Sequence, residues 1–127
     1  MVIGGLHDLD GGALRVRAQR TVTAWERTRG LLARPAPAPG TGLIISPCSS
    51  VHMFGMRYAI DVVYLDCDWT IVSIVSGLKP WRASWGRGAA HVLETAAGEA
   101  RRLGLMPGLR LQWVASGSGP AMDSVPA

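Results

Sequence analysis

The sequence predicts an α+β fold in which short strands form a barrel-like or strongly curved, mostly antiparallel sheet with two short helices. Six short apolar or alternating segments are separated by turn-forming residues, which is typical of a strand-rich chain. A sheet that closes on itself leaves no exposed edge, and this favours the barrel-like form. A chain of 127 residues can build one core of its own. We therefore predict one globular domain over residues 13–115, a flexible N-terminus at 1–12 and a flexible tail at 116–127.

The first predicted strand and helix follow the flexible start. Residues 13–18 alternate apolar and basic side chains, so we expect a strand with one face in water. Residues 22–34 place apolar side chains at helical spacing, which predicts a helix with an apolar face. Either Thr21 or Thr23 can serve as its N-cap. Gly30 weakens this helix near its end.

A bent segment from Cys48 to Asp66 organises the middle of the chain. It follows a proline-rich connector at 35–42 and a short apolar strand at 42–46. As one extended strand, its 19 residues would span about 60 Å, several times the usual strand length. The segment must therefore bend, and Gly55 is the least costly hinge because it lacks a Cβ atom.

Residues 60–65 predict a buried central strand because they are β-branched and aromatic. Side-chain alternation places Asp61 on one face with Val63 and Leu65. A buried carboxylate needs a cation or backbone N–H donors, and Arg57 is the nearest cation in the sequence. Two interpretations stay open for this group. It forms a structural salt bridge or turn cap at the strand entrance, or it forms one wall of a polar pocket.

The C-terminal half continues the strand pattern. Residues 66–69 predict a tight turn that joins strand 60–65 to a second strand in a β-hairpin. The remaining elements are a strand at 70–75, a loop at 77–87, a strand at 90–94, a helix at 97–103 ended by Gly104, and a closing strand at 109–114. The loop carries both tryptophans and cations, namely Lys79, Trp81, Arg82, Trp85 and Arg87. No acidic residue lies between Asp68 and Glu94.

Three blocks of the chain carry a family likeness. They are VHMFGMRYAIDVVYLD at 51–66, LKPWR at 78–82 and HVLETAAGEARRLGLMPG at 91–108. In order and spacing, these blocks resemble the prokaryotic domain of unknown function 192 family, and the likeness runs from about Thr23 to Val114. The resemblance implies a compact, strand-rich α+β domain and implies no particular activity.

The chain differs from the family pattern at two positions. Trp69 stands where relatives usually have glycine, and it places a large aromatic ring at the hairpin tip. Leu109 stands where relatives usually have aspartate, so any role of that acid is absent here.

Composition and charge restrict the class of protein. Hydrophobic residues make up 48% of the chain, but no run approaches the ~20 apolar residues of a membrane-spanning helix. The N-terminus lacks a basic segment and places Asp8 and Asp10 where a signal peptide would be apolar, so we expect a cytoplasmic protein. The net charge is +4 and comes almost entirely from arginine, which suits anionic partners but also follows from biased composition. Cys48 and Cys67 are expected to be free thiols, although the sequence allows a disulfide between them.

Known catalytic and cofactor motifs are absent. The sequence has no Walker A, GxGxxG or GxSxG motif. Cys48 and His52 have a spacing that suits a metal, but no second ligand pair accompanies them. Ser50, His52 and Asp61 include the residue types of a catalytic triad, yet such residues occur together by chance in most chains. We therefore expect no catalytic residue, no metal and no cofactor.

One group of residues combines charges with a flat apolar ring. Its members lie in the parts of the chain that carry the family likeness, and they are His52, Arg57, Asp61, Lys79, Trp81, Arg82 and Glu94. Apolar concavities with a few fixed polar groups are typical of small-ligand sites. The first hypothesis is a non-catalytic module that binds a small anionic or mixed-charge ligand. The second is a nucleic-acid or protein-partner module that uses the basic, tryptophan-containing segment 79–87. An enzyme is the third.

Overall fold

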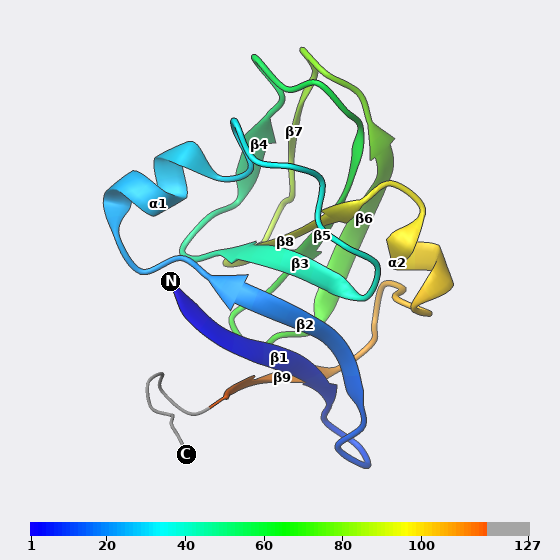
Figure 1. The fold of residues 1–127 in the computed structure, drawn as a ribbon. Coiled ribbons are helices and arrows are strands. Elements are labelled where there is room, and N and C mark those ends of the chain that lie inside the picture. Colours follow the sequence, from blue (N-terminus) through cyan, green and yellow to red (C-terminus); the bar gives the residue numbers. More distant parts are fainter. Residues whose placement is uncertain (117–127) are drawn as a thin grey trace.

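A computed structural model describes residues 1–116, in which short strands predominate and two short helices accompany them (Figure 1). The strands are β1 (Val2–Asp8), β2 (Leu14–Arg20), β3 (Thr41–Ile45), β4 (Ser50–His52), β5 (Ile60–Leu65), β6 (Ile71–Leu78), β7 (Ala83–Trp85), β8 (His91–Ala96) and β9 (Leu111–Ala115). The helices are α1 (Ala24–Arg29) and α2 (Glu99–Arg102). In this part of the chain, seven strands form one mixed sheet in the order β6-β5-β8-β3-β2-β1-β9, and β4 pairs with β7.

The prediction of a strand-rich, mostly antiparallel sheet with two short helices is confirmed, but the main sheet is not a closed barrel. Strand β2 runs parallel to β3, and the other ladders of the described residues are antiparallel. The two edge strands, β6 and β9, approach each other through an isolated bridge between Thr70 and Arg110. Next to it, the Ile71 N–H donates to the Leu109 carbonyl at 3.0 Å. Within residues 1–116, β6 and β9 form no ladder with each other beyond this point, so the sheet is open.

The N-terminal segment is part of the sheet, so the flexible start predicted for residues 1–12 is wrong over Val2–Asp8. Strand β1 lies between β2 and β9 and pairs with both. Its Leu6 is fully buried in the core. The sequence VIGGLHD does not alternate clearly, because two glycines occupy positions where the neighbouring strands approach closely. The predicted tail lies outside the described residues from position 117 onward.

Strand β5, second from one edge of the sheet, separates two apolar cores, one on each face. Val63 and Leu65 belong to the first core, together with Leu6 and Val16 of the N-terminal strands. The other side chains of β5 belong to the second core, and they are Ile60, Val62 and Tyr64. This division confirms the predicted alternation of β5. The predicted hairpin is also confirmed, because β5 and β6 pair antiparallel with Val63 opposite Ile74.

Both helices are shorter than the sequence pattern predicts. Helix α1 begins after Thr23, which forms a capping box with Glu26, and it ends at Gly30. None of its residues is buried, and Trp25 is 70% exposed, so the apolar face predicted over 22–34 does not pack as a helical face. Gly30 ends the helix early because its backbone adopts φ +52°. Neither helix within residues 1–116 is long and apolar enough to span a membrane.

The bent segment and the following loop contain structure that the sequence did not indicate. The chain turns at Gly55, where φ is +81°, which confirms the predicted hinge. Before this turn lies β4, and within the predicted loop 77–87 lies β7. The two strands are only three residues long and pair with each other, His52 lying opposite Ala83. Strands this short have no detectable alternation, so only their pairing reveals them. Cys48 and Cys67 are free thiols, one of the two states that the sequence allowed.

Candidate functional site

A buried carboxyl group on β8 is the most unusual polar feature of the fold. Glu94 lies opposite Val62 of β5 and Leu43 of β3. Paired residues in a ladder share a face, so Glu94 points into the second core, which contains both of these residues. Its side chain is 6% exposed and has no hydrogen-bond or ion-pair partner among the described residues.

Burial sets the protonation of Glu94. Removal from water disfavours the charged carboxylate and raises the pKa of Glu94 from 4.5 to about 7. The group therefore changes charge close to neutral pH. A buried polar group without a partner is rare in folded proteins and calls for an explanation, such as a ligand that completes it.

Glu94 borders a cavity of about 90 Å³. Side chains and backbone from the end of α1, from β3 and from the segment that contains β4 line this cavity. The polar lining residues are Arg27, Thr28, Arg29, Cys48, Ser50, His52 and Glu94, and the apolar ones include Leu31, Ile45, Val51, Met53, Phe54, Met56 and Ile60. The cavity therefore combines apolar and polar lining and has a single acid among these residues.

The position of α1 brings basic side chains to this cavity. The helix is fixed at its start by the Thr23 capping box and by an ion pair of 2.9 Å between the Met1 ammonium group and Glu26. A Cβ atom on Gly30, just after the helix, would lie 3.7 Å from a carboxyl oxygen of Glu94. The C-terminal end of α1 therefore lies directly over Glu94, and Arg27 borders the same cavity.

The Cys48 thiol also borders the cavity, but its surroundings do not activate it. Burial raises the pKa of Cys48, and the nearby Glu94 acts in the same direction. The thiol donates to the Ser50 carbonyl oxygen at 3.0 Å. Because the thiolate is the reactive form, Cys48 is a poor nucleophile at neutral pH. Among residues 1–116, no three His, Cys, Asp or Glu side chains cluster in a way that could hold a metal ion.

The structure brings together part of the predicted group. His52 and Glu94 border the same cavity. Trp81 connects to it through a row of stacked rings: His52 lies 4.9 Å from Phe54, and Phe54 lies 6.0 Å from Trp81, measured between ring centroids. The predicted residues His52, Trp81 and Glu94 therefore belong to one region.

The remaining cations of the predicted group do not border the Glu94 cavity. Arg57 borders a separate cavity of about 540 Å³ beside Arg34 and Tyr58. The side chains of Lys79 and Arg82 are exposed on the loop between β6 and β7. These three cations lie on the two loops that carry Phe54 and Trp81 and do not line the Glu94 cavity.

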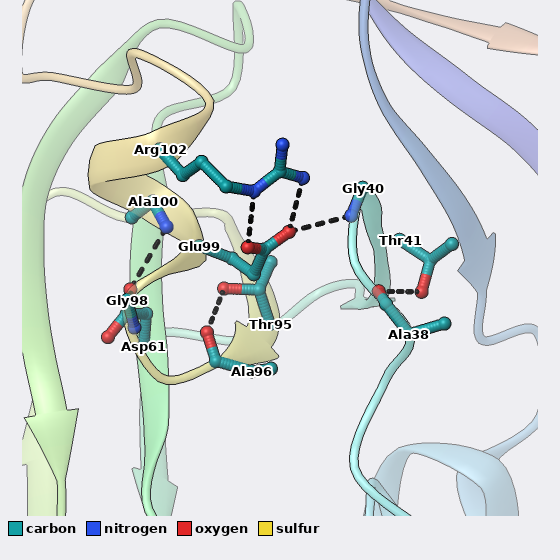
Figure 2. A network of polar contacts seen from close by, with 10 residues as sticks. All are labelled: Ala38, Gly40, Thr41, Asp61, Thr95, Ala96, Gly98, Glu99, Ala100 and Arg102. Atoms are coloured by element: carbon teal, nitrogen blue, oxygen red, sulfur yellow. Dashed lines mark hydrogen bonds and ion pairs between the residues drawn. The ribbon is translucent and has the colours of Figure 1, made fainter.

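Asp61 lies on the opposite face of the sheet from Glu94, and both of its carboxyl oxygens accept hydrogen bonds from backbone N–H groups. One oxygen accepts from Gly77 N–H at 2.9 Å, and the other accepts from Gly98 N–H and Ala100 N–H, both at 3.0 Å. Figure 2 shows Asp61 below the first turn of α2, with Ala100 bonded to it. The cation considered from the sequence, Arg57, does not pair with it within residues 1–116. The contact corresponds to a turn cap, one of the two interpretations left open by the sequence.

Several residues around the cavity carry no sequence signal. Arg27, Thr28 and Arg29 border it because the end of α1 lies next to Glu94 of β8, and no spacing in the sequence indicates this contact. Glu94 was identifiable as an acid within an apolar strand, although its lack of a partner was not. A second large cavity, of about 530 Å³, lies between the β2–β3 face and residues 34–38, but its arginines are not deeply buried.

Sequence comparisons connect the chain to an uncharacterised family. The model of the DUF192 family, described as "Uncharacterized ACR", matches residues 7–113. A UPF0127 protein of Pyrococcus abyssi (strain GE5 / Orsay) is 33% identical over 67 residues, which cover 52% of this chain and 56% of that relative. A UPF0127 protein of Thermococcus sibiricus (strain DSM 12597 / MM 739) is 30% identical over 96 residues, covering 72% and 62%. The chain thus spans about three fifths of the length of these relatives.

Solved structures share the fold. A protein from Sinorhizobium meliloti 1021, described as a candidate transcription regulator, has a TM-score of 0.74 and 26% identity, covering 88% of this chain and 92% of that one. A protein of unknown function from Novosphingobium aromaticivorans DSM 12444 has a TM-score of 0.73 and 23% identity, covering 87% and 84%. The second likeness concerns the fold alone.

Proposed function

Since the chain belongs to the DUF192 family, whose description gives no activity, we propose that it is a non-catalytic module that binds a small mixed-charge ligand at Glu94. One observation carries the proposal: a buried carboxyl group without a partner among the described residues borders a cavity with mixed apolar and polar lining. Concave sites that combine apolar surface with fixed polar groups are typical of small-ligand binding.

The carboxyl group selects the end of the ligand that enters the cavity. An ionised carboxylate accepts hydrogen bonds and attracts positive charge, so it favours an ammonium or hydroxyl donor. A donor at this point supplies the missing partner of Glu94 and offsets the cost of its burial. An anionic group would instead be repelled by Glu94.

The basic residues at the rim of the cavity favour a negatively charged group on the ligand. Arg27 and Arg29 of α1 border the cavity, and their guanidinium groups suit a carboxylate or phosphate. A ligand with a donor end at Glu94 and an acidic group near α1 matches both charges. Amino acids, amino sugar acids and peptide ends have this combination.

The size of the cavity limits what it can enclose. A volume of about 90 Å³ accommodates a terminal group, whereas typical enclosed ligands occupy roughly 300–1,000 Å³. The rest of the ligand therefore lies outside, where His52 and Phe54 border the cavity and present aromatic surface. The module thus binds one end of a ligand and leaves the remainder accessible.

The test is a small-molecule screen at pH 8 by ligand-observed NMR, using amino acids, dipeptides and amino sugars on wild type and Glu94→Gln. Loss of a charge-assisted hydrogen bond should weaken binding about 10- to 100-fold. Affinity for an amine should rise as the pH rises through about 7, because Glu94 must be ionised to bind it.

The matched control is Asp68→Asn, which removes an exposed carboxylate from the hairpin turn. This variant should bind the same compounds as wild type does. The proposal fails if wild type binds none of these compounds, or if Glu94→Gln binds them with unchanged affinity.

A further inference from the structure

Two loops form an exposed aromatic end of the molecule, and most of this surface lies outside the proposed ligand site. Residues 53–57 and 79–82 project together beyond β4 and β7, at the top of Figure 1. We call these two segments the aromatic tip. Phe54 is 51% exposed and Trp81 is 67% exposed. Leu32, which is 41% exposed, lies against Gly55 and extends the apolar surface.

The backbone holds the aromatic tip in one arrangement. The Trp81 N–H donates to the Met53 carbonyl at 2.8 Å, and the Met53 N–H donates to the Arg82 carbonyl at 2.7 Å. The Met53 side chain is 1% exposed, so it anchors both loops to the second core. Trp81 adopts φ +68°, a conformation that residues other than glycine rarely take. A large ring is thus held outward at a strained position.

The rings lie in a row that leaves their edges exposed. His52 and Phe54 are inclined by 29°, and Phe54 and Trp81 by 27°, so each ring covers part of its neighbour's face. Base stacking on single-stranded nucleic acid needs open ring faces along a groove. A projecting row of rings instead suits insertion into an apolar layer, and tryptophan is favoured at the boundary between lipid and water.

The charges around the rings are all positive. Arg57, Lys79 and Arg82 are exposed, and none of them forms an ion pair within residues 1–116. The segments 48–60 and 69–93 contain no acidic residue. Basic residues beside inserted aromatic side chains attract anionic lipid headgroups.

We propose that the aromatic tip docks on the surface of an anionic lipid bilayer. Phe54 and Trp81 enter the headgroup region, and the three cations of the tip lie against lipid phosphates. This is peripheral contact by a rigid loop pair, and it needs no spanning segment. It does not require ligand binding at Glu94, although Phe54 belongs to both surfaces.

The experiment is cosedimentation of the full chain with vesicles of phosphatidylcholine alone or with phosphatidylglycerol added. Binding is expected to the anionic vesicles only and should weaken with salt. Trp81→Gly removes the ring and suits the left-handed backbone, so it should fold normally and bind about tenfold less. Lys79→Ala and Arg82→Ala should each lower binding about fivefold.

Two controls separate this surface from the rest of the molecule. Trp25→Ala removes another tryptophan, 70% exposed on α1, and should bind vesicles like wild type. Glu94→Gln should also bind vesicles normally, so failure of the ligand proposal leaves this one standing. Thermal melts establish that each variant is folded.

Three results would overturn the proposal. They are the absence of binding to anionic vesicles, unchanged binding by folded Trp81→Gly, and equal loss of binding in Trp25→Ala. Tight, salt-sensitive binding of wild type to a single-stranded oligonucleotide that Trp81→Gly abolishes would assign the tip to nucleic acid instead.

Discussion

Asp61 and Glu94 are buried acids on neighbouring strands, but their hydrogen bonding differs. Asp61 is 1% exposed and accepts three backbone hydrogen bonds. Glu94 is 6% exposed and has no partner among the described residues. The first carboxylate stabilises the fold, whereas the second is costly whenever it ionises. This contrast is why Glu94, and not Asp61, is the centre of the ligand proposal.

The cost of Glu94 predicts a specific pH dependence of stability. Its folded pKa, about 7, lies above the unfolded value of 4.5, so the unfolded chain loses its proton first. The free energy of unfolding should therefore fall as the pH rises from 4.5 to 7 and then stay level. At pH 8, Glu94→Gln should be more stable than wild type by about 3 kcal/mol, measured by urea denaturation.

The same two proteins provide the control for this prediction at low pH. Below pH 4.5, Glu94 is neutral in both folded and unfolded wild type, so the stabilities should converge. Parallel stability curves for wild type and Glu94→Gln across the whole pH range would contradict an ionising buried Glu94.

His91 predicts the opposite pH dependence, in which the free energy of unfolding falls as the pH falls. Its ring stacks on Trp69 with centroids 3.6 Å apart, and its Nδ1 lies 2.6 Å from the Ser46 hydroxyl. Burial lowers the pKa of His91 to about 4, Arg20 nearby acts in the same direction and Asp66 opposes it. The unfolded chain therefore gains its proton first, and stability should be lost as the pH falls from 6.5 towards 4. An NMR titration of the His91 ring with a midpoint near or above 6.5 would contradict this.

The polar contacts of α2 explain how a four-residue helix holds its place. Asp61 accepts N–H groups at the start of the helix. Glu99 accepts from Arg102 at 2.7 and 2.8 Å and from the Gly40 N–H at 2.7 Å, which ties α2 to the connector before β3 (Figure 2). A helix this short has little stability of its own, so these contacts and packing determine its position.

Asp61→Ala should therefore destabilise the fold strongly. The substitution leaves three N–H groups without their acceptor, and hydrogen bonds to a charged group contribute roughly 1.5–3 kcal/mol each. We expect a loss of at least about 3 kcal/mol in chemical denaturation, with faster hydrogen exchange at Gly98 and Ala100. Asp68→Ala, which removes an exposed acid, should change stability little. A near-native stability of Asp61→Ala would show that α2 is held without this carboxylate.

The sheet depends on its N-terminal strand. Strand β1 lies between β2 and β9 in the described sheet, and β9 meets the opposite edge only near its start, through the Thr70–Arg110 bridge and the adjoining backbone hydrogen bonds. A Cβ atom on Gly4 would collide with the Val114 carbonyl oxygen and would lie 2.7 Å from the Trp113 ring. Close approach of β1 and β9 therefore requires glycine at this position.

Gly4→Val should separate β9 from the sheet. Overpacking at a buried contact costs typically 1–3 kcal/mol, and the loss should appear as a lower melting temperature and faster exchange of β9 amides. Ile3→Ala in the same strand removes a side chain that is 61% exposed, so it should have a much smaller effect. Equal stability of Gly4→Val and wild type would mean that β1 does not pack as described.

Local patterns in the sequence determined much of the secondary structure. Alternation fixed the two faces of β5, the turn residues fixed its hairpin with β6, and the absence of a Cβ atom fixed the bend at Gly55. The cap at Thr23 was also among the predicted alternatives. These features depend on residues close in sequence, because side-chain period and backbone freedom are local properties.

The tertiary structure alone decided the strand identity of residues 2–8, the pairing of β4 with β7 and the open form of the sheet. It also decided that Asp61 meets backbone donors while Glu94 meets none. Short strands gain their hydrogen bonds from segments far away in the chain. Whether a buried acid finds a partner likewise depends on which distant backbone groups reach it, and no spacing within the sequence contains that information.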